Sequence, residues 1–178
     1  GEIVGIVGAN GAGKSTFLRC LCGMEKRCKA TLTIGNESWN NKARRRKLYM
    51  VMQDVNHQLF TDSVLEEVMI SQENENKDEA LKILESLDLR EYADKHPLAL
   101  SGGQKQRVAV ASAIASGRDI ILFDEPTSGL DYYHMLQVAD ILKQLRENCK
   151  TVIIVTHDVE LIKTACTHII RFEEYYGS

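Results

Sequence analysis

The residues with the clearest chemical potential form a glycine-rich loop near the start of the chain. Residues 8–16 read G-A-N-G-A-G-K-S-T and fit the pattern G-x-x-x-x-G-K-[ST]. An apolar run, Ile3–Val7, precedes the loop, and a helical apolar pattern that includes Leu18 and Leu21 follows it. The phosphate-binding loop called Walker A requires this order of strand, loop and helix. The motif therefore predicts a P-loop NTPase fold.

Each part of this loop has a physical task in holding phosphate groups. Glycines let phosphate oxygens approach the backbone and adopt positive φ, while successive N–H groups and the following helix N-terminus form an electropositive nest. Lys14 is expected to reach the β- and γ-phosphates, and Ser15 to offer its hydroxyl to Mg²⁺. The predicted phosphate-binding residues are Gly8, Ala9, Asn10, Gly11, Ala12, Gly13, Lys14, Ser15 and Thr16.

Further polar residues directly follow apolar runs that have the character of buried strands. They are Gln53 after residues 48–52, Asp124 and Glu125 after residues 120–123, and His157 after residues 151–156. In open α/β sheets, ligands bind beyond the carboxyl ends of the strands. The sequence therefore predicts a mainly parallel sheet flanked by helices, with these polar residues and the phosphate loop converging at one edge.

These side chains suit phosphoryl transfer, which depends mostly on positioning and charge stabilisation. We expect Asp124 to hold Mg²⁺, directly or through water, and Glu125 to polarise the attacking water as a general base. The alternative for two adjacent carboxylates is a charged turn. His157 could hydrogen-bond the γ-phosphate, and Gln53 could offer its amide oxygen to Mg²⁺ or the water. Each of these two could instead be only a satisfied polar residue. The predicted metal ligands are Ser15, Gln53 and Asp124.

The remaining periodicity indicates several helices. Helical patterns start at Ser63, recur through Ala80 and Leu87, and continue from Ser101 to about residue 115. Residues 55–115 are thus predicted to form an inserted helical subdomain. The basic run 42–47 is interpreted as a solvated connection, with a nucleic-acid patch as the alternative. The polar tract 72–79 is interpreted in the same way, as an exposed connection.

Composition places limits on the class of protein. The 178 residues suit one domain, and a net charge of −3 gives no overall basic field for nucleic acid. No apolar run is long enough to span a bilayer. The five cysteines are odd in number and contain no C-x-x-C pair, which favours neither a disulfide framework nor a zinc site. A reducing compartment is expected.

The segment L-S-G-G-Q at residues 100–104 resembles the signature of the ABC ATPases. The order of motifs is also similar, because this segment lies between Walker A and the strand that ends in Asp124. The resemblance covers nearly the whole chain and implies a single ABC ATPase domain, residues 1–178, that binds ATP and Mg²⁺. In this family Gln53 would be the Q-loop glutamine and His157 the switch histidine.

The resemblance further implies a head-to-tail dimer that sandwiches two ATP molecules. Each ATP would lie between Walker A of one subunit and the signature of the other. Ser101, Gly102, Gly103 and Gln104 would then form a second anion cradle at a helix N-terminus. Asp131, in the D-loop S-G-L-D at residues 128–131, would lie at the subunit boundary and couple the two sites.

Residues 53–68 are similar to ATPases of energy-coupling-factor importers, which take up vitamins and transition-metal ions. In that family this segment contacts the transmembrane partner. ABC ATPases also carry antiparallel strands before Walker A, with an aromatic residue that stacks on adenine. This chain begins one strand before the loop. We therefore expect it to be N-terminally truncated relative to the family, and no adenine-stacking residue is assigned.

The resulting prediction is an ATP-binding and ATP-hydrolysing subunit that powers a membrane importer. Its expected partners are a second ABC ATPase subunit, in a homo- or heterodimer, and a transmembrane subunit docking near the Q-loop, with no nucleic acid. Its expected location is the cytoplasmic face of the cell membrane. The alternative is a soluble ABC ATPase that acts on ribosomes or DNA. The very long coiled-coil insertions of the DNA-acting class are absent from residues 17–99.

Overall fold

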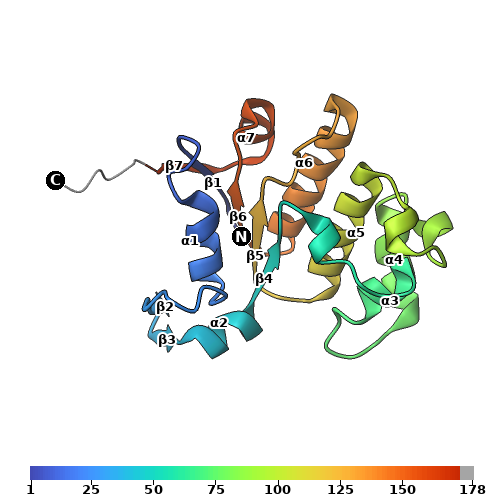
Figure 1. Cartoon of the computed structure of the whole chain (residues 1–178), viewed down its shortest axis with the longest axis horizontal. Helices are drawn as coiled ribbons and strands as arrows, with labels where there is room; N and C mark the ends of the chain where they lie inside the picture. Colours follow the sequence, from blue (N-terminus) through green and yellow to red (C-terminus); the bar gives the residue numbers. More distant parts are fainter. Residues whose placement is uncertain (173–178) are drawn as a thin grey trace.

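A parallel sheet forms the centre of the computed structural model, which describes residues 1–172. The predicted domain, residues 1–178, thus includes residues 173–178, which lie outside the described part. The strand order is β4-β5-β6-β1-β7, and each adjacent pair is parallel (Figure 1). This confirms the predicted mainly parallel α/β sheet. The strands are β1 (Ile3–Val7), β4 (Leu48–Val51), β5 (Ile120–Asp124), β6 (Thr151–Val155) and β7 (His168–Arg171).

Helices cover both faces of this sheet, as the apolar strands require. On one face lies α1 (Lys14–Leu21; Figure 1). Its Leu18 is buried in one cluster with Ile6 and Val155. Full burial of one such leucine stabilises the fold by about 1.5–3 kcal/mol. The opposite face packs against α5 (Gly102–Ala115), α6 (Tyr132–Glu147) and α7 (Val159–Ala165). Consecutive β5 residues alternate between these two cores, which fixes the orientation of the strand end.

The helical subdomain lies beside the sheet, at the right of Figure 1. It contains α3 (Val64–Met69), α4 (Lys77–Ser86) and the amino-terminal part of α5, joined by short 3₁₀ turns at Val55–His57, Arg90–Tyr92 and Pro97–Ala99. Polar N-caps start the helices, because Ser63, Asn76 and Ser101 each accept a backbone N–H bond. The helix expected from Ser63 is confirmed. The tract 72–79 is only partly a connection, since α4 starts at Lys77.

The basic run 42–47 is not the solvated connection that the sequence indicated. Residues Asn41–Lys47 form helix α2, which follows the hairpin of β2 (Leu32–Ile34) and β3 (Glu37–Trp39). Arg44 is only 1% exposed. Its guanidinium donates to the carbonyl oxygens of Cys20 and Ala30, both at 2.8 Å, and to the side chain of Asn41. The interpretation was wrong because a charge run gives no sign that one member turns inward to bind backbone carbonyls.

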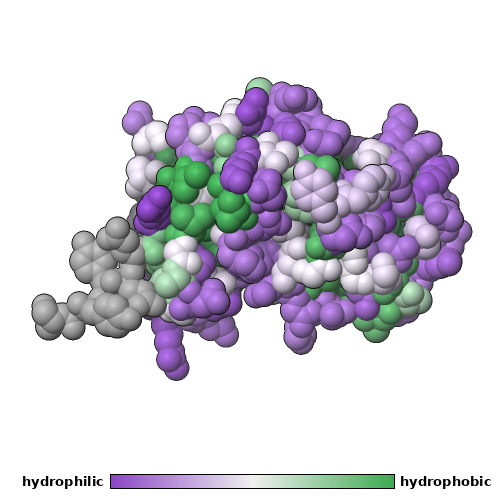
Figure 2. All heavy atoms as spheres, turned by 90° about the horizontal axis from the view of Figure 1, so that it is seen from above, coloured by the Kyte–Doolittle hydropathy of each residue, from purple (hydrophilic) through white to green (hydrophobic). Residues whose placement is uncertain are grey.

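The surface is mostly hydrophilic on the face seen from above, with an apolar patch beside α7 and β7 (Figure 2). Val159 and Ile169 are more than half exposed there. Within residues 1–172, no helix is long and apolar enough to cross a bilayer.

Candidate functional site

The loop from Gly8 to Gly13 has the backbone shape that a phosphate nest requires. Gly11 and Gly13 have φ of 85° and 91°, a region that side chains with a Cβ rarely adopt. The space beside Gly11 is open, because a Cβ there would meet no atom within 4 Å. Helix α1 then begins at Lys14 with its free N–H groups directed at the same region. The described loop thus fits an anion with several oxygens.

Lys14 folds back over this loop. Its Nζ donates to the carbonyl oxygens of Gly8 at 2.8 Å and Ala9 at 2.7 Å, and the residue is only 8% exposed. These two contacts fix the ammonium group within the nest. A phosphate bound there would meet both the backbone N–H groups and a fixed positive charge.

Ser15 and Asp124 come together from α1 and β5. The Ser15 hydroxyl donates to Oδ1 of Asp124 at 2.9 Å. Burial raises the pKa of the Asp124 carboxyl above its ordinary value, whereas the hydrogen bond from Ser15 and the charge of Lys14 oppose this rise. A buried carboxylate gains most from a nearby cation, because little water competes for it. Hydroxyl, carboxylate and amide oxygens are also the ligands that Mg²⁺ accepts, so these residues fit the predicted metal.

Glu125 and His157 come together from two neighbouring strand ends. Nδ1 of His157 lies 2.9 Å from Oε1 of Glu125. The Glu125 side chain is 11% exposed, whereas that of His157 is 74% exposed. Glu125 has a φ of 51°, and its N–H donates to the Val155 carbonyl oxygen at 2.8 Å. A non-glycine residue in this strained region marks a position that surrounding contacts dictate, often at functional sites.

Most of these residues line one open cleft of about 440 Å³ at the carboxyl edge of the sheet, whereas Asp124 is buried against Ser15 and does not line it. The phosphate loop supplies one wall, and the opposite side chains come from the ends of three strands. The predicted convergence is therefore found in the structure. The lining residues are Asn10, Gly11, Gly13, Lys14, Ser15, Thr16, Gln53, Glu125, Val155 and His157.

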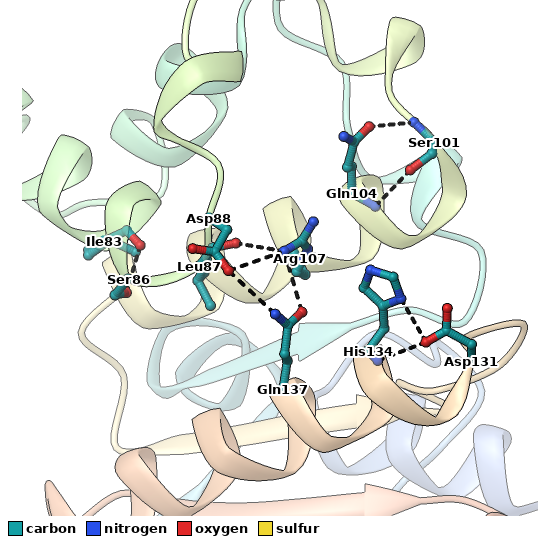
Figure 3. Close-up of polar contacts among 10 residues, drawn as sticks. All are labelled: Ile83, Ser86, Leu87, Asp88, Ser101, Gln104, Arg107, Asp131, His134 and Gln137. Atoms are coloured by element: carbon teal, nitrogen blue, oxygen red, sulfur yellow. Dashed lines mark hydrogen bonds and ion pairs between the residues drawn. The ribbon is translucent and has the colours of Figure 1, made fainter.

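The segment at Ser101 does not line this cleft. Ser101 accepts the Gln104 N–H at 3.3 Å, and the Gln104 side chain accepts the Ser101 N–H at 2.9 Å (Figure 3). This capping box leaves the following glycines at the exposed start of α5. Asp131 caps α6 by accepting the His134 N–H at 2.9 Å, and it also contacts Nδ1 of His134 at 2.8 Å. Hydrogen bonds from His134 lower the pKa of Asp131.

Two polar contacts that organise the strand ends were missed in the sequence. Gln58 accepts the Met52 N–H and donates to the Met50 carbonyl oxygen, both at 3.1 Å, so it fixes the chain next to Gln53. Thr127 donates to Asp158 at 2.9 Å and thereby joins the segments after Glu125 and His157. No sequence pattern distinguishes these side chains, because both contacts depend on the folded path of loops.

Comparison with known proteins identifies the family. A family model described as ABC transporter matches residues 1–128. The chain belongs to this family. It is 46% identical over 170 residues to an ABC transporter ATP-binding protein of Treponema denticola, covering 96% of this chain and 35% of that protein. The chain thus spans about a third of that relative's length.

Two other comparisons concern named transport proteins. The chain is 38% identical over 186 residues to the arginine transport ATP-binding protein ArtM of Bacillus subtilis, covering 98% of this chain and 77% of ArtM. The structure of cbiO1 from Clostridium perfringens, part of the ABC transporter complex cbiONQ, superposes with a TM-score of 0.83. It shares 28% identity, and the match covers 97% of this chain and 74% of cbiO1. Fold and family are therefore those of ABC ATPase cassettes.

Proposed function

We propose that this ABC domain binds and hydrolyses ATP to power a membrane importer. The observation that carries the proposal is that the phosphate loop, with Ser15 bonded to the buried Asp124, and the Glu125–His157 pair line one cleft. Family membership and the named transport relatives support the same activity. They do not favour the alternative of a soluble ATPase that acts on ribosomes or DNA.

The proposed roles follow from the contacts in the cleft. Gly8 to Thr16 would bind the phosphates, while Ser15, Asp124 and Gln53 would hold Mg²⁺, which neutralises charge on the phosphates. Glu125 would accept the proton of the attacking water. The 2.9 Å contact with His157 limits the rotation of this carboxyl group and aims it into the cleft. His157 itself, being largely exposed, would remain able to reach the γ-phosphate.

We propose that the working unit is a head-to-tail pair of ABC domains. The cleft is open to solvent, whereas Ser101, Gly102 and Asp131 lie exposed at two helix N-termini elsewhere on the chain. A second domain that brings its own such segment over the cleft would enclose the γ-phosphate between two sets of N–H groups. ATP would then hold the pair together, and loss of phosphate would weaken it.

A groove on the helical subdomain is the proposed contact for a transmembrane partner. Phe60 is 73% exposed and Ile70 is 54% exposed at its rim. The buried carboxyl of Glu67 accepts the N–H groups of Phe60 and Thr61 at 2.9 and 3.0 Å, so the loop that carries Phe60 is held rigidly. An exposed aromatic on a rigid loop is a suitable anchor for a partner. The groove follows the Gln53 segment along the chain, which would link docking to the nucleotide site.

The energy-coupling-factor subtype remains part of this proposal. The sequence of residues 53–68 and the similarity to cbiO1 support it. The similarity to ArtM supports the alternative of an amino-acid importer. In either case the domain would lie at the cytoplasmic face of the membrane, bound to a transmembrane subunit.

Co-purification tests the transport assignment. The full-length protein that contains this chain would be tagged, and its membranes solubilised in mild detergent. Integral membrane proteins should co-purify with it, and their identity would name the class of importer. Phe60→Asp should abolish their recovery, whereas Val159→Asp, at a similarly exposed apolar site on α7, should leave it unchanged. Recovery of ribosomes or DNA-repair proteins instead would contradict the transport role while leaving the ATPase chemistry intact.

A further inference from the structure

A buried arginine joins three helices beneath the exposed signature segment. Arg107 lies on α5 and is only 8% exposed. Its Nη1 donates to the Leu87 carbonyl oxygen at 3.0 Å and to Oε1 of Gln137 at 3.4 Å (Figure 3). Leu87 caps the end of α4, and Gln137 lies on α6. One guanidinium therefore links the helical subdomain to a helix that packs on the sheet.

The surroundings of this guanidinium favour a single arrangement. It lies at the carboxyl end of α4, where a positive charge is stabilised. Asp88, which has a φ of 54°, places Oδ2 4.0 Å from Nη1 of Arg107 and 3.4 Å from Nε2 of Gln137. Since a buried charge is costly unless it is hydrogen-bonded, movement of α5 relative to α6 would have to break favourable contacts.

This contact lies close behind the two segments that we expect to face the partner domain. Ser101 starts α5 and Asp131 starts α6, and Arg107 and Gln137 lie roughly two turns beyond them. The two helix starts also approach each other, because a Cβ at Gly103 would lie 3.4 Å from Cδ2 of Leu130. The position of one start relative to the other is thus set by the contact behind them.

We propose that Arg107 and Gln137 are positioning residues for the partner-facing surface. Their hydrogen bond fixes the register of α5 against α6, so that Ser101–Gly103 and Asp131 are presented as one unit. This inference rests on the proposed head-to-tail pair. It concerns presentation to the partner's ATP and leaves the phosphate loop of the same chain unaffected.

Hydrogen exchange on the nucleotide-free protein tests the positioning directly. Gln137→Leu keeps the size of the side chain but removes the acceptor for Arg107. Amide exchange should become faster at residues 100–106 and 128–136 and stay unchanged at residues 14–21. The matched control is Gln144→Leu, the same substitution at an exposed site on the same helix. Gln144 lines the small pocket that also contains Arg107 and Gln137. Gln137→Glu alone would place a second carboxylate beside Asp88, so the rescue variant is Gln137→Glu with Asp88→Asn, which keeps an acceptor for Arg107 and should restore protection.

A dimerisation measurement gives the second readout. In a Glu125→Gln background, which slows hydrolysis, Gln137→Leu should weaken ATP-driven dimerisation about tenfold or more, as small misplacements do at reacting sites. Nucleotide affinity of the monomer should not change. Faster exchange in every helix, or exchange and dimerisation equal to those of Gln144→Leu, would overturn the inference. If the Glu125→Gln parent itself failed to dimerise, that result would instead contradict the proposed function. The exchange experiment would still test the inference, because it does not depend on dimerisation.

Discussion

Two adjacent carboxyl groups in this site have contrasting environments. Asp124 is 4% exposed and bound to Ser15, whereas Glu125 turns into the open cleft and contacts His157. Asp124 is the last residue of β5 and Glu125 lies just beyond the strand end, so one carboxyl can hold a metal while the next is directed at a substrate. The backbone turns sharply at Glu125, where φ is 51°. Different roles for the two residues follow from this geometry.

Asp124→Asn should weaken the binding of ATP with Mg²⁺ but raise the thermal stability of the nucleotide-free domain. Because burial raises the pKa of Asp124, the native state binds its proton more tightly than the unfolded chain does. Ionisation therefore destabilises the fold as pH rises from the ordinary value of about 3.9 through the raised native value. Without nucleotide, the variant should unfold at a higher temperature than wild type at pH 7 and at the same temperature well below pH 3.9.

Thermal unfolding across this pH range, with and without Mg²⁺ and ATP, measures both effects. The variant should lose the stabilisation that Mg²⁺ adds to ATP binding. Asp94→Asn, at an exposed carboxyl, serves as control. Equal unfolding temperatures for Asp124→Asn and wild type at pH 7 would contradict the cost assigned to the buried charge.

At the scale of elements, α2 stabilises the helix that follows the phosphate loop. Arg44 donates to the carbonyl oxygen of Cys20, near the carboxyl end of α1, and to that of Ala30 in the following loop. The guanidinium thus adds a charged donor to a carbonyl oxygen in the last turn of α1 that also accepts the Gly23 N–H at 3.0 Å. It also connects α1 to the β2–β3 hairpin region, so the phosphate loop is supported from both ends of its helix.

Arg44→Met should destabilise the domain by about 2–4 kcal/mol, because two or more charge-assisted hydrogen bonds are lost from a buried site. Urea unfolding measures this free energy. Arg45→Met, one residue along the same helix but exposed, should cost no more than about 0.5 kcal/mol. Similar losses for the two variants would mean that the buried contacts of Arg44 contribute little.

The sequence predicts the regular elements of this fold better than its tertiary polar contacts. Strands β1, β5 and β6 are apolar runs, and α4 and α6 repeat at helical spacing, so local pattern suffices. The convergence of Gln53, Glu125 and His157 follows from one general property of parallel sheets. Arg44, Gln58 and Arg107 escaped notice because most of their partners are backbone atoms, and backbone atoms leave no mark in a sequence.

At the scale of the whole molecule, the cleft and the starts of α5 and α6 are separate surfaces of the domain. The cleft holds the phosphate loop and Glu125, whereas Ser101 and Asp131 lie exposed at the starts of α5 and α6. Tyr132 and Tyr133, beside Asp131, are 64% and 66% exposed. Exposed aromatics next to an exposed helix start are typical of a surface that another protein covers.

Ser101→Arg should separate ATP binding from ATP-driven dimerisation. The bulky cation would occupy the proposed cradle at α5 but lies outside the cleft, so ATP affinity of the isolated domain should remain unchanged. ATP-driven dimerisation, followed by sedimentation velocity, should be lost. Ser38→Arg, on the exposed strand β3, is a control that should dimerise normally. Dimerisation of Ser101→Arg at the wild-type level would refute the cradle supplied in trans.

The most direct test of ATP hydrolysis at this cleft is turnover by Glu125→Gln. The amide keeps the size of the side chain and an oxygen to contact His157, but it cannot accept a proton from water. ATP affinity should be unchanged, and hydrolysis should fall about 10²-fold or more. Glu160→Gln, an exposed carboxyl on α7, should match wild type. Near wild-type turnover by Glu125→Gln would contradict the account, because another group would then have to activate the water.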